Sequence, residues 1–275
     1  RKLVFAVTSV IVVFAVFGMI KMKAEGFIVD DLPHETKEYR DLLFFEEHFN
    51  GIMPFEVVIS AKSGKKIRGS RQYKLIKKMD KGQKVMESFD EISRTLSVAD
   101  GYKFINQAYH NGHTKFYKMP SKMDLSRIKK YVSSESDKAS QKIIDAFIAD
   151  SSRYYRIKGQ VKDLGSIKLP VLRDSVKSAL SKVFDPEIYD VRITGTSVVF
   201  IAGNSYLVKS LIQSLLLAFI IIALIMAFMF RSSKMLLVCL IPNTIPLIIT
   251  AGIMGYFNIP LKPSTVLVFS VAYGI

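Results

Sequence analysis

The chain has 275 residues and a formal net charge of +15, and its apolar residues are gathered in blocks rather than spread along the sequence. Its one cysteine, Cys239, lies inside such a block, which excludes a domain stapled by internal disulfides. Ten of the net positive charges fall on residues 3–209, as expected for a surface that meets anionic lipid or an acidic substrate, or one that is simply solvated. Nucleic acid is not an expected partner, because the apolar blocks on either side place this region outside a membrane.

Three apolar blocks are long enough to cross a bilayer. No charge interrupts Leu3–Ile20, Ser210–Phe230 or Met235–Leu261, which contain 18, 21 and 27 residues. A hydrocarbon core about 30 Å thick needs about 20 helical residues at a rise of about 1.5 Å each. The predicted transmembrane segments are therefore 1–23, 201–231 with an extension outside the membrane, 234–259, and the start of a fourth at 264–275.

Basic residues at the ends of these segments predict the orientation. Arg1 and Lys2 precede the apolar run of the first segment, and Arg231 and Lys234 lie between the apolar runs of the second and third. Lysine and arginine are retained in short cytoplasmic loops, so both ends are predicted in the cytoplasm and residues 24–200 outside it. The first block has no small-residue cleavage site before its basic end, which favours an uncleaved anchor over a secretory signal peptide. Twelve uncharged residues are too few for the fourth segment to span, so we expect the chain to continue beyond them.

Helices and strands alternate along the predicted outer domain, in an order read from the spacing of apolar residues. The predicted helices are Glu35–Phe49, Ser70–Phe89, Asp100–His110, Ser121–Val132, Ser136–Ala149 and Pro170–Phe184. The predicted strands are Phe55–Ser60, Ser93–Val98, Tyr154–Val161 and Tyr189–Ile193. Ser121 and Asp124 have the spacing of a capping box, and Pro170 suits the first turn of its helix.

Without the helices inserted at about 100–150, this order is strand, helix, strand, strand, helix, strand. It is the ferredoxin-like split βαβ arrangement, in which a small sheet carries its helices on one face. The predicted fold class is therefore a polytopic α-helical membrane protein with an α+β extracytoplasmic domain of this kind.

The sequence presents no catalytic constellation, so we expect neither an enzyme nor a cofactor. His110 and His113 are the right distance apart for a metal pair, but no carboxylate or cysteine stands close to them in sequence, and two surface histidines are favoured over a metal site. The glycines around Gly64–Ser70 lack the spacing of a phosphate-binding loop and predict a turn.

The predicted spans contain no Asp, Glu, Lys, Arg or His, so these segments are not expected to carry protons by themselves. Their polar residues are milder, and hydrogen bonds between helices are their favoured role. Pro242 and Pro246 are expected to kink the third segment. The candidate transport or packing positions are Asn243, Pro242, Pro246, Ser264, Thr265, Tyr273 and Gly274.

One span, a large outer domain and then clustered spans resemble the beginning of resistance-nodulation-division (RND) exporters, and several short motifs carry the resemblance. These are Asp31-Leu32-Pro33, Phe49-Asn50-Gly51, Ile193-Thr194-Gly195, Phe230-Arg231-Ser232, Ile241-Pro242-Asn243, Pro260-Leu261-Lys262-Pro263-Ser264-Thr265 and Ala272-Tyr273-Gly274-Ile275. The likeness covers nearly the whole chain, is densest over its last 80 residues or so, and is similar to the lipid-exporter, MMPL-like branch with a sterol-sensing-type bundle. In that family a porter-type outer domain moves substrate, and a membrane Asp follows the motif that ends here at Ile275.

The resemblance implies proton-driven export of lipids or other hydrophobic or amphiphilic molecules in a bacterial inner membrane, with the large domain on the periplasmic side. The partners it implies are membrane lipids, the substrate, the C-terminal part of the transporter, and another copy of the chain or a periplasmic protein. Two alternatives share the layout: the permease of a MacB-like ABC exporter, which needs a cytoplasmic ATPase, and a membrane sensor or lipid-responsive scaffold. An Asp within four positions after Ile275 would decide for the RND class.

Overall fold

The computed structural model describes residues 2–23, 25–27, 32–132, 146–150, 152–230 and 232–274. The chain divides into two compact units. The apolar helical unit comprises Arg1–Asp30, Gly165–Ile167 and Phe200–Ile275, and the sheet unit comprises Asp31–Leu164 and Lys168–Val199.

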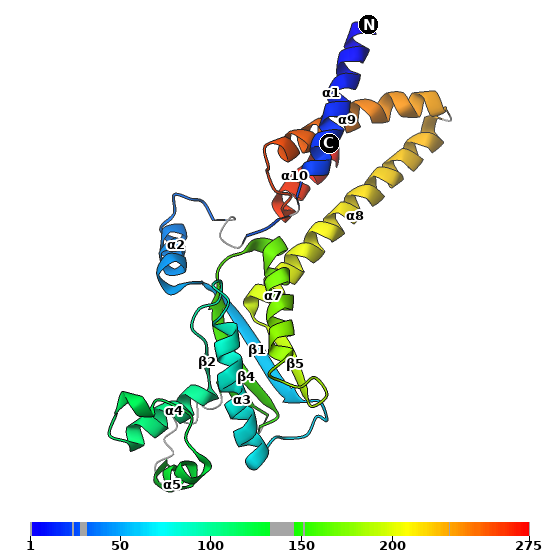
Figure 1. Cartoon of the computed structure of the whole chain (residues 1–275). Helices are drawn as coiled ribbons and strands as arrows, with labels where there is room; N and C mark the ends of the chain where they lie inside the picture. Colours follow the sequence, from blue (N-terminus) through cyan, green and yellow to red (C-terminus); the bar gives the residue numbers. More distant parts are fainter. Residues whose placement is uncertain are drawn as a thin grey trace. The chain divides into compact units, whose positions relative to one another are not determined.

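The apolar helical unit is built from α1 (Lys2–Lys21), most of α8 (Thr196–Phe230), α9 (Ser233–Tyr256) and α10 (Pro263–Gly274) (Figure 1). The first three are long and apolar enough to cross a membrane, as the sequence predicted, whereas α10 has only 12 residues. Their apolar side chains are mostly uncovered, and Phe228 on α8 is 86% exposed. An apolar surface of this extent needs lipid or protein against it.

The sheet unit follows the order β1 (Met53–Ala61), α3 (Ser70–Met86), β2 (Leu96–Ser97), β4 (Tyr154–Val161), α7 (Gly165–Ser181) and β5 (Tyr189–Thr194). The strands lie in the order β2-β4-β1-β5, and every neighbouring pair is antiparallel. The central pair aligns Val57 with Ile157, and β5 aligns Ile193 with Val57. This strand order and its two helical crossovers are those of the predicted split βαβ arrangement.

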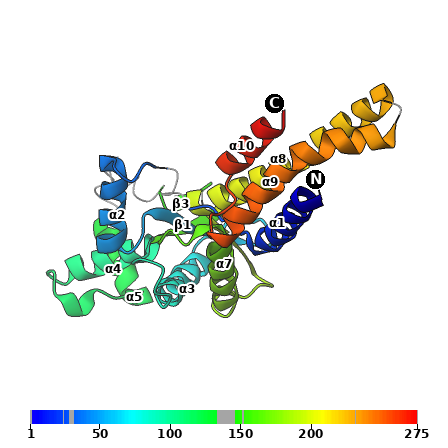
Figure 2. The same cartoon turned by 90° about the horizontal axis from the view of Figure 1, so that it is seen from above.

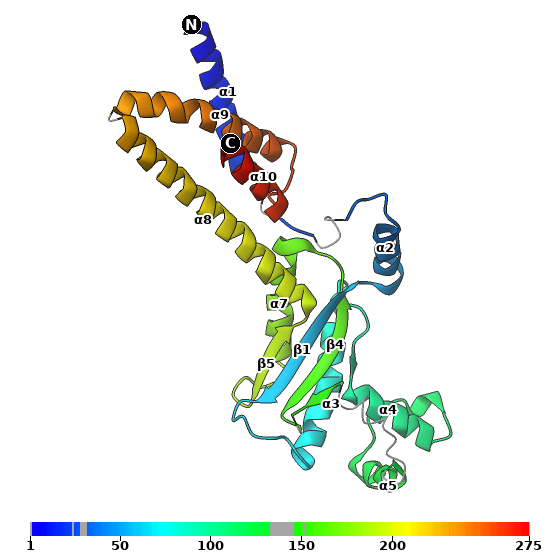
Figure 3. The ribbon, with the colours of Figure 1, turned by 180° about the vertical axis from the view of Figure 1, so that it is seen from behind.

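The core lies between one face of the sheet and the two crossover helices (Figures 1 and 3). Alternate residues of β1 and β4 are buried because successive side chains of a strand point to opposite faces. The fully buried side chains include Phe55, Val57, Ile59, Tyr155, Ile157, Leu75, Met79, Val176 and Leu180. Gly82 on α3 packs closely on Phe184, where an added Cβ would lie 2.9 Å from the ring.

The predicted strand Ser93–Val98 is largely wrong. Of its residues only Leu96 and Ser97 form a strand with β4, beside an isolated bridge of Ile92 with Val161, and the chain then turns at once into α4 (Val98–Tyr109). Ser97 and Asp100 form a complete capping box there. The hydroxyl of Ser97 accepts from backbone N–H groups of the first helical turn, and the carboxylate of Asp100 accepts from the backbone N–H of Ser97. The cap ends the strand, because the hydroxyl and the carboxylate satisfy backbone donors that begin a helix.

The helices inserted between β2 and β4 differ in part from the prediction. After α4 come a short 3-10 turn, η2 (Thr114–Phe116), and α5 (Lys122–Val132), which lies beside α4 (Figure 2). The predicted helix Ser136–Ala149 falls mostly outside the described residues, and its last two residues are instead strand β3 (Ile148–Ala149), paired with β4. Apolar residues in so short a run do not distinguish helix from strand.

The two remaining helices begin away from their predicted first residues. Helix α7 starts at Gly165, five residues before Pro170, so the proline lies inside the helix and not in its first turn. Gly165 has a φ of +69°, which a residue with a side chain adopts only with strain. Helix α2 (Lys37–Phe49) begins after Thr36, whose side chain accepts a hydrogen bond from the backbone N–H of Tyr39.

Candidate functional site

Three of the candidate transport positions lie on α9, which is one uninterrupted helix through Pro242 and Pro246. The side chain of the third, Asn243, lies outside what the structure describes. The threonines around them differ from the prediction of interhelical bonds, because Thr244 donates to the carbonyl of Leu240 at 2.9 Å and Thr250 to that of Pro246 at 2.8 Å. Hydroxyls that bond back within their own helix satisfy themselves and often accompany a bend.

Contact between α1 and α9 depends on small residues and one tyrosine. An added Cβ on Gly252 would lie 2.5 Å from the Cα of Ala15, and one on Gly18 would lie 2.8 Å from the carbonyl carbon of Gly252. Small residues let two apolar helices approach this closely. Tyr256 donates its hydroxyl to the carbonyl of Phe14 at 2.9 Å, so for this residue the prediction of an interhelical hydrogen bond is confirmed.

The remaining candidate positions lie on α10, a neighbour of α9. Pro263 is its first residue, and the hydroxyl of Thr265 both accepts from the N–H of Lys262 at 2.9 Å and donates to its carbonyl at 2.8 Å. Thr265 therefore binds both backbone polar groups of the residue before the helix. Ser264 beside it is exposed. The side chain of Tyr273 and the surroundings of Gly274 lie outside what the structure describes. Within the described part of both helices, no hydrogen bond joins the α9 candidates to the α10 candidates.

The residues that join β5 to α8 pack closely against strand β1. Gly195 follows β5 with a φ of +118°, and an added Cβ there would lie 3.0 Å from the carbonyl carbon of Pro54. Ser197, in the first turn of α8, is fully buried and donates its hydroxyl to the carbonyl of Pro54 at 2.7 Å. The first turn of α8 is thereby bonded to the start of the central strand β1, and the helix then continues without a break to Phe230.

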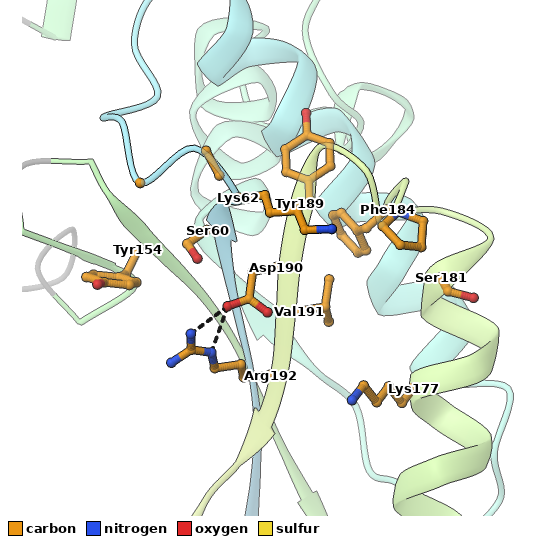
Figure 4. A pocket seen from close by; sticks show the side chains of 13 residues that line it. Ser60, Lys62, Tyr154, Lys177, Ser181, Phe184, Tyr189, Asp190, Val191 and Arg192 are labelled. Carbon is orange, nitrogen blue, oxygen red and sulfur yellow. Dashed lines mark hydrogen bonds and ion pairs between the residues drawn. The ribbon is translucent and has the colours of Figure 1, made fainter.

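A cavity of about 500 Å³ lies at the edge strand β5, where β1 ends and α7 ends (Figure 4). Tyr189 and Val191 point to the helix side of the strand, and Asp190 and Arg192 to the other side, as the alternation of a strand requires. Phe184 and Pro186 supply apolar wall, and lysines reach in from two elements. The volume is in the range of small-molecule sites, roughly 300–1,000 Å³.

The charges around this cavity are unevenly balanced. Arg192 is held by Asp190 at 2.7 Å, whereas Lys62 and Lys177 have no carboxylate within ion-pair distance among the described residues. Burial raises the pKa of Tyr189. The Nζ atom of Lys78 lies over its ring, 4.9 Å from the centroid, in a cation–π contact. The cavity therefore combines an apolar wall with excess positive charge, which suits an anionic amphiphile.

The sequence analysis missed this cavity although it predicted the strand Tyr189–Ile193. The signal that was lacking is the register: β5 pairs with β1 so that Tyr189 lies opposite Ala61, one residue before Lys62. Only that pairing brings the loop after β1 and the end of α7 to the same place. Without that pairing, Lys62 after β1 and Lys177 on α7 are interpreted simply as solvated surface residues.

The two histidines considered for a metal site, His110 and His113, have different surroundings. The ring of His110 stacks on that of Phe116, with centroids 3.7 Å apart, and His113 precedes η2. In the described part of the chain, no group of three or more His, Cys, Asp or Glu side chains is placed to hold a metal ion. Gly64 and Gly69 both have positive φ, as a turn requires, and an added Cβ at either would meet nothing within 4 Å.

No protein-family model matches this chain, and no curated protein matches it.

Proposed function

We propose that the chain works in proton-driven export of lipids or other amphiphilic molecules, as part of an RND-type transporter in a bacterial inner membrane. The observation that carries the proposal is the continuity of α8, which runs as one helix from its anchor at Pro54 into an apolar segment long enough to cross a membrane. In this proposal, α8 carries a displacement of that segment to the sheet unit. Helix packing that changes when acidic groups are protonated would thus move the sheet unit.

Two further features support this function. The cavity at β5 offers an apolar wall and two lysines to an amphiphile, and the glycine contact of α1 with α9 lets two apolar helices pack closely. In this proposal the sheet unit is a porter-type domain on the periplasmic side. The energy enters through acidic residues of other segments, because the described apolar helices hold none.

A proline at Val208 tests the lever. It removes one helical hydrogen bond, crowds the carbonyl of Asn204 and costs about 3 kcal/mol in a helix interior. The variant is made in the native host, in place of the unsubstituted protein. We expect Val208→Pro to abolish export of a fluorescent phosphatidylglycerol analogue while the amount of variant protein inserted in the membrane stays normal. Val208→Ala, which keeps the helix, is the control and should export normally. Unchanged export by the proline variant would contradict the lever.

The same assay separates the alternatives. An uncoupler that collapses the proton gradient should stop export within the time of the measurement. Export that survives the uncoupler but stops with an ATPase inhibitor, together with an ATPase that copurifies, would favour a MacB-like permease instead. A sensor or lipid-responsive scaffold would export nothing under either condition, and that outcome would overturn the proposal.

A further inference from the structure

Helix α2 has large apolar side chains that the described part of the chain does not cover. None of its 13 residues is buried. Phe44, Phe45 and Phe49 are 53%, 51% and 56% exposed. A helix of this length is only marginally stable alone in water, and packing of an apolar face supplies most of the stability of helices in proteins. Helix α2 therefore needs an apolar surface against it.

These three phenylalanines form one aromatic cluster in the second half of the helix. The rings of Phe44 and Phe45 meet edge to face with their centroids 6.1 Å apart, and those of Phe45 and Phe49 stack at 5.2 Å. His48 stacks on Phe44 at 4.1 Å and adds a polar ring at the margin. The other residues of the helix are largely charged. Phenylalanines gathered on an otherwise charged helix are typical of helices that lie in the surface of a bilayer.

Contacts with the end of β4 hold the part of α2 that carries the aromatic cluster. The carboxylate of Glu46 accepts a hydrogen bond from the backbone N–H of Asp163 at 2.9 Å. An added Cβ on Gly51, two residues after the helix, would lie 2.6 Å from the carbonyl carbon of Val161. The chain after α2 thus runs directly against the last residue of β4. The aromatic cluster is therefore kept beside the residues that lead from β4 into α7.

A short path of chain and hydrogen bonds leads from Asp163 to a helix of membrane-spanning length. Three residues after Asp163, the hydroxyl oxygen of Ser166 accepts from the N–H of Gly26 at 3.0 Å, and the N–H of Ser166 donates to the carbonyl of Gly26 at 3.0 Å. Gly26 follows Lys21, the last residue of α1, by five residues. Each residue spans at most about 3.6 Å, so this path tethers Asp163 within about 35 Å of Lys21. Such a tether lets even a weak affinity for the bilayer surface suffice, because it keeps the local concentration high.

We propose that α2 lies in the surface of the lipid bilayer, with the aromatic cluster inserted between the lipid headgroups. Helices α1 and α8 are long and apolar enough to cross that bilayer, which brings its surface within reach of the tether. Helix α2 has four carboxylates and only two lysine or arginine side chains. Insertion of the rings, and not attraction to anionic lipid, therefore holds it there. The inference rests on membrane insertion alone and does not depend on export.

The test uses tryptophan fluorescence of the whole chain in phosphatidylcholine vesicles. The sequence contains no tryptophan, so a single introduced one reports its own surroundings. Phe45→Trp should emit at shorter wavelength than Phe104→Trp, and lipid brominated near the headgroup should quench it at least about twofold more. Phe104 is the matched control, because it is 65% exposed on α4, at the other end of the sheet unit from α2 (Figures 1 and 3). Phe228→Trp, in the apolar run of α8, reports that the chain is inserted.

Three results would overturn the proposal when Phe228→Trp is quenched. The first is equal quenching of Phe45→Trp and Phe104→Trp, which leaves α2 in water. The second is short-wavelength emission of Phe45→Trp without quenching, because protein and not lipid then covers the aromatic cluster. The third is stronger quenching by lipid brominated near the chain ends than by lipid brominated near the headgroup, which contradicts a position at the surface.

Substitutions on α2 locate the contact with lipid. In the Phe45→Trp chain, Phe49→Asp should lower the quenching at least about twofold, because it places a charge within the inserted cluster. Arg40→Asp is the matched control, since it puts the same side chain at an exposed position of the same helix outside the cluster. It should leave the quenching unchanged. Equal losses in the two variants would sink the assignment of the contact to the aromatic cluster.

Discussion

A single methyl group at Gly252 should separate α1 from α9. A Cβ at this position would lie 2.5 Å from both the Cα and the carbonyl oxygen of Ala15, atoms of a neighbouring backbone that no rotamer change moves away. Carbon atoms in contact prefer about 3.5–4.0 Å, so the two helices must part by about 1 Å. Gly203 on α8 provides a matched control, because an added Cβ there meets nothing within 4 Å.

The expected magnitude follows from these contacts. Overpacking typically costs about 1–3 kcal/mol, and the hydrogen bond from Tyr256 to Phe14 adds about 0.6 kcal/mol if the separation breaks it. Replacing a helical glycine by alanine returns about 1 kcal/mol of helix propensity. We therefore expect Gly252→Ala to destabilise the helix pair by about 0.6–2.6 kcal/mol, and Gly203→Ala to be neutral or to stabilise by up to about 1 kcal/mol.

The assay is unfolding by SDS in mixed micelles, followed by energy transfer between dyes on α1 and α9. Native Cys239 on α9 takes one dye, and Phe5→Cys, at a position that is 73% exposed on α1, takes the other. Gly252→Ala should lose energy transfer at a lower SDS fraction than the unsubstituted chain, whereas Gly203→Ala should not. Identical midpoints for Gly252→Ala and Gly203→Ala would refute the backbone contact.

Further predictions concern the sheet unit of the whole chain in detergent, unfolded with urea and followed by the near-ultraviolet circular dichroism of its tyrosines. Tyr155→Phe removes the donor to the buried carbonyl of Ile67 and should cost about 1–2 kcal/mol; an unchanged midpoint would contradict this. Lys103→Met leaves Asp80 and Asp100 without their shared cation and should cost about 1–3 kcal/mol, so equal stability would argue against the ion pairs. Burial lowers the pKa of Lys103, but bonds and charges of both aspartates outweigh it and raise the pKa above 10.5. Its contribution to stability is therefore complete below pH 10.5 and lost as the pH rises through the raised value, and Lys103→Met should remove this alkaline loss.

Local pattern predicted much of the fold. The apolar runs required helices, since an unpaired backbone is not tolerated among apolar surroundings, and α1, α8 and α9 follow them. Alternation predicted β4 as Tyr154–Val161 and all but the last residue of β5, because the strand period matches burial on one face. Where signals were short the prediction failed: β2 shrank to two residues beside the Ser97 cap, and β3 replaced the end of a helix.

The candidate positions on α9 and α10 came from residue type alone, and side-chain partners are decided by the neighbour that packs there. The hydroxyl of Thr244 bonds within its own helix, whereas that of Tyr256 bonds to a carbonyl of α1. The contact of Gly18 with Gly252 is likewise invisible in the sequence, because it depends on how two helices cross.

The sequence by itself determined which segments are apolar helices and which alternate as strands, because burial periodicity is a property of neighbours along the chain. Only the tertiary structure decided the strand order, the register of Tyr189 against Ala61, and the close contact of Gly18 with Gly252. These arrangements join residues far apart in sequence, and their geometry depends on how the whole core packs rather than on any local preference.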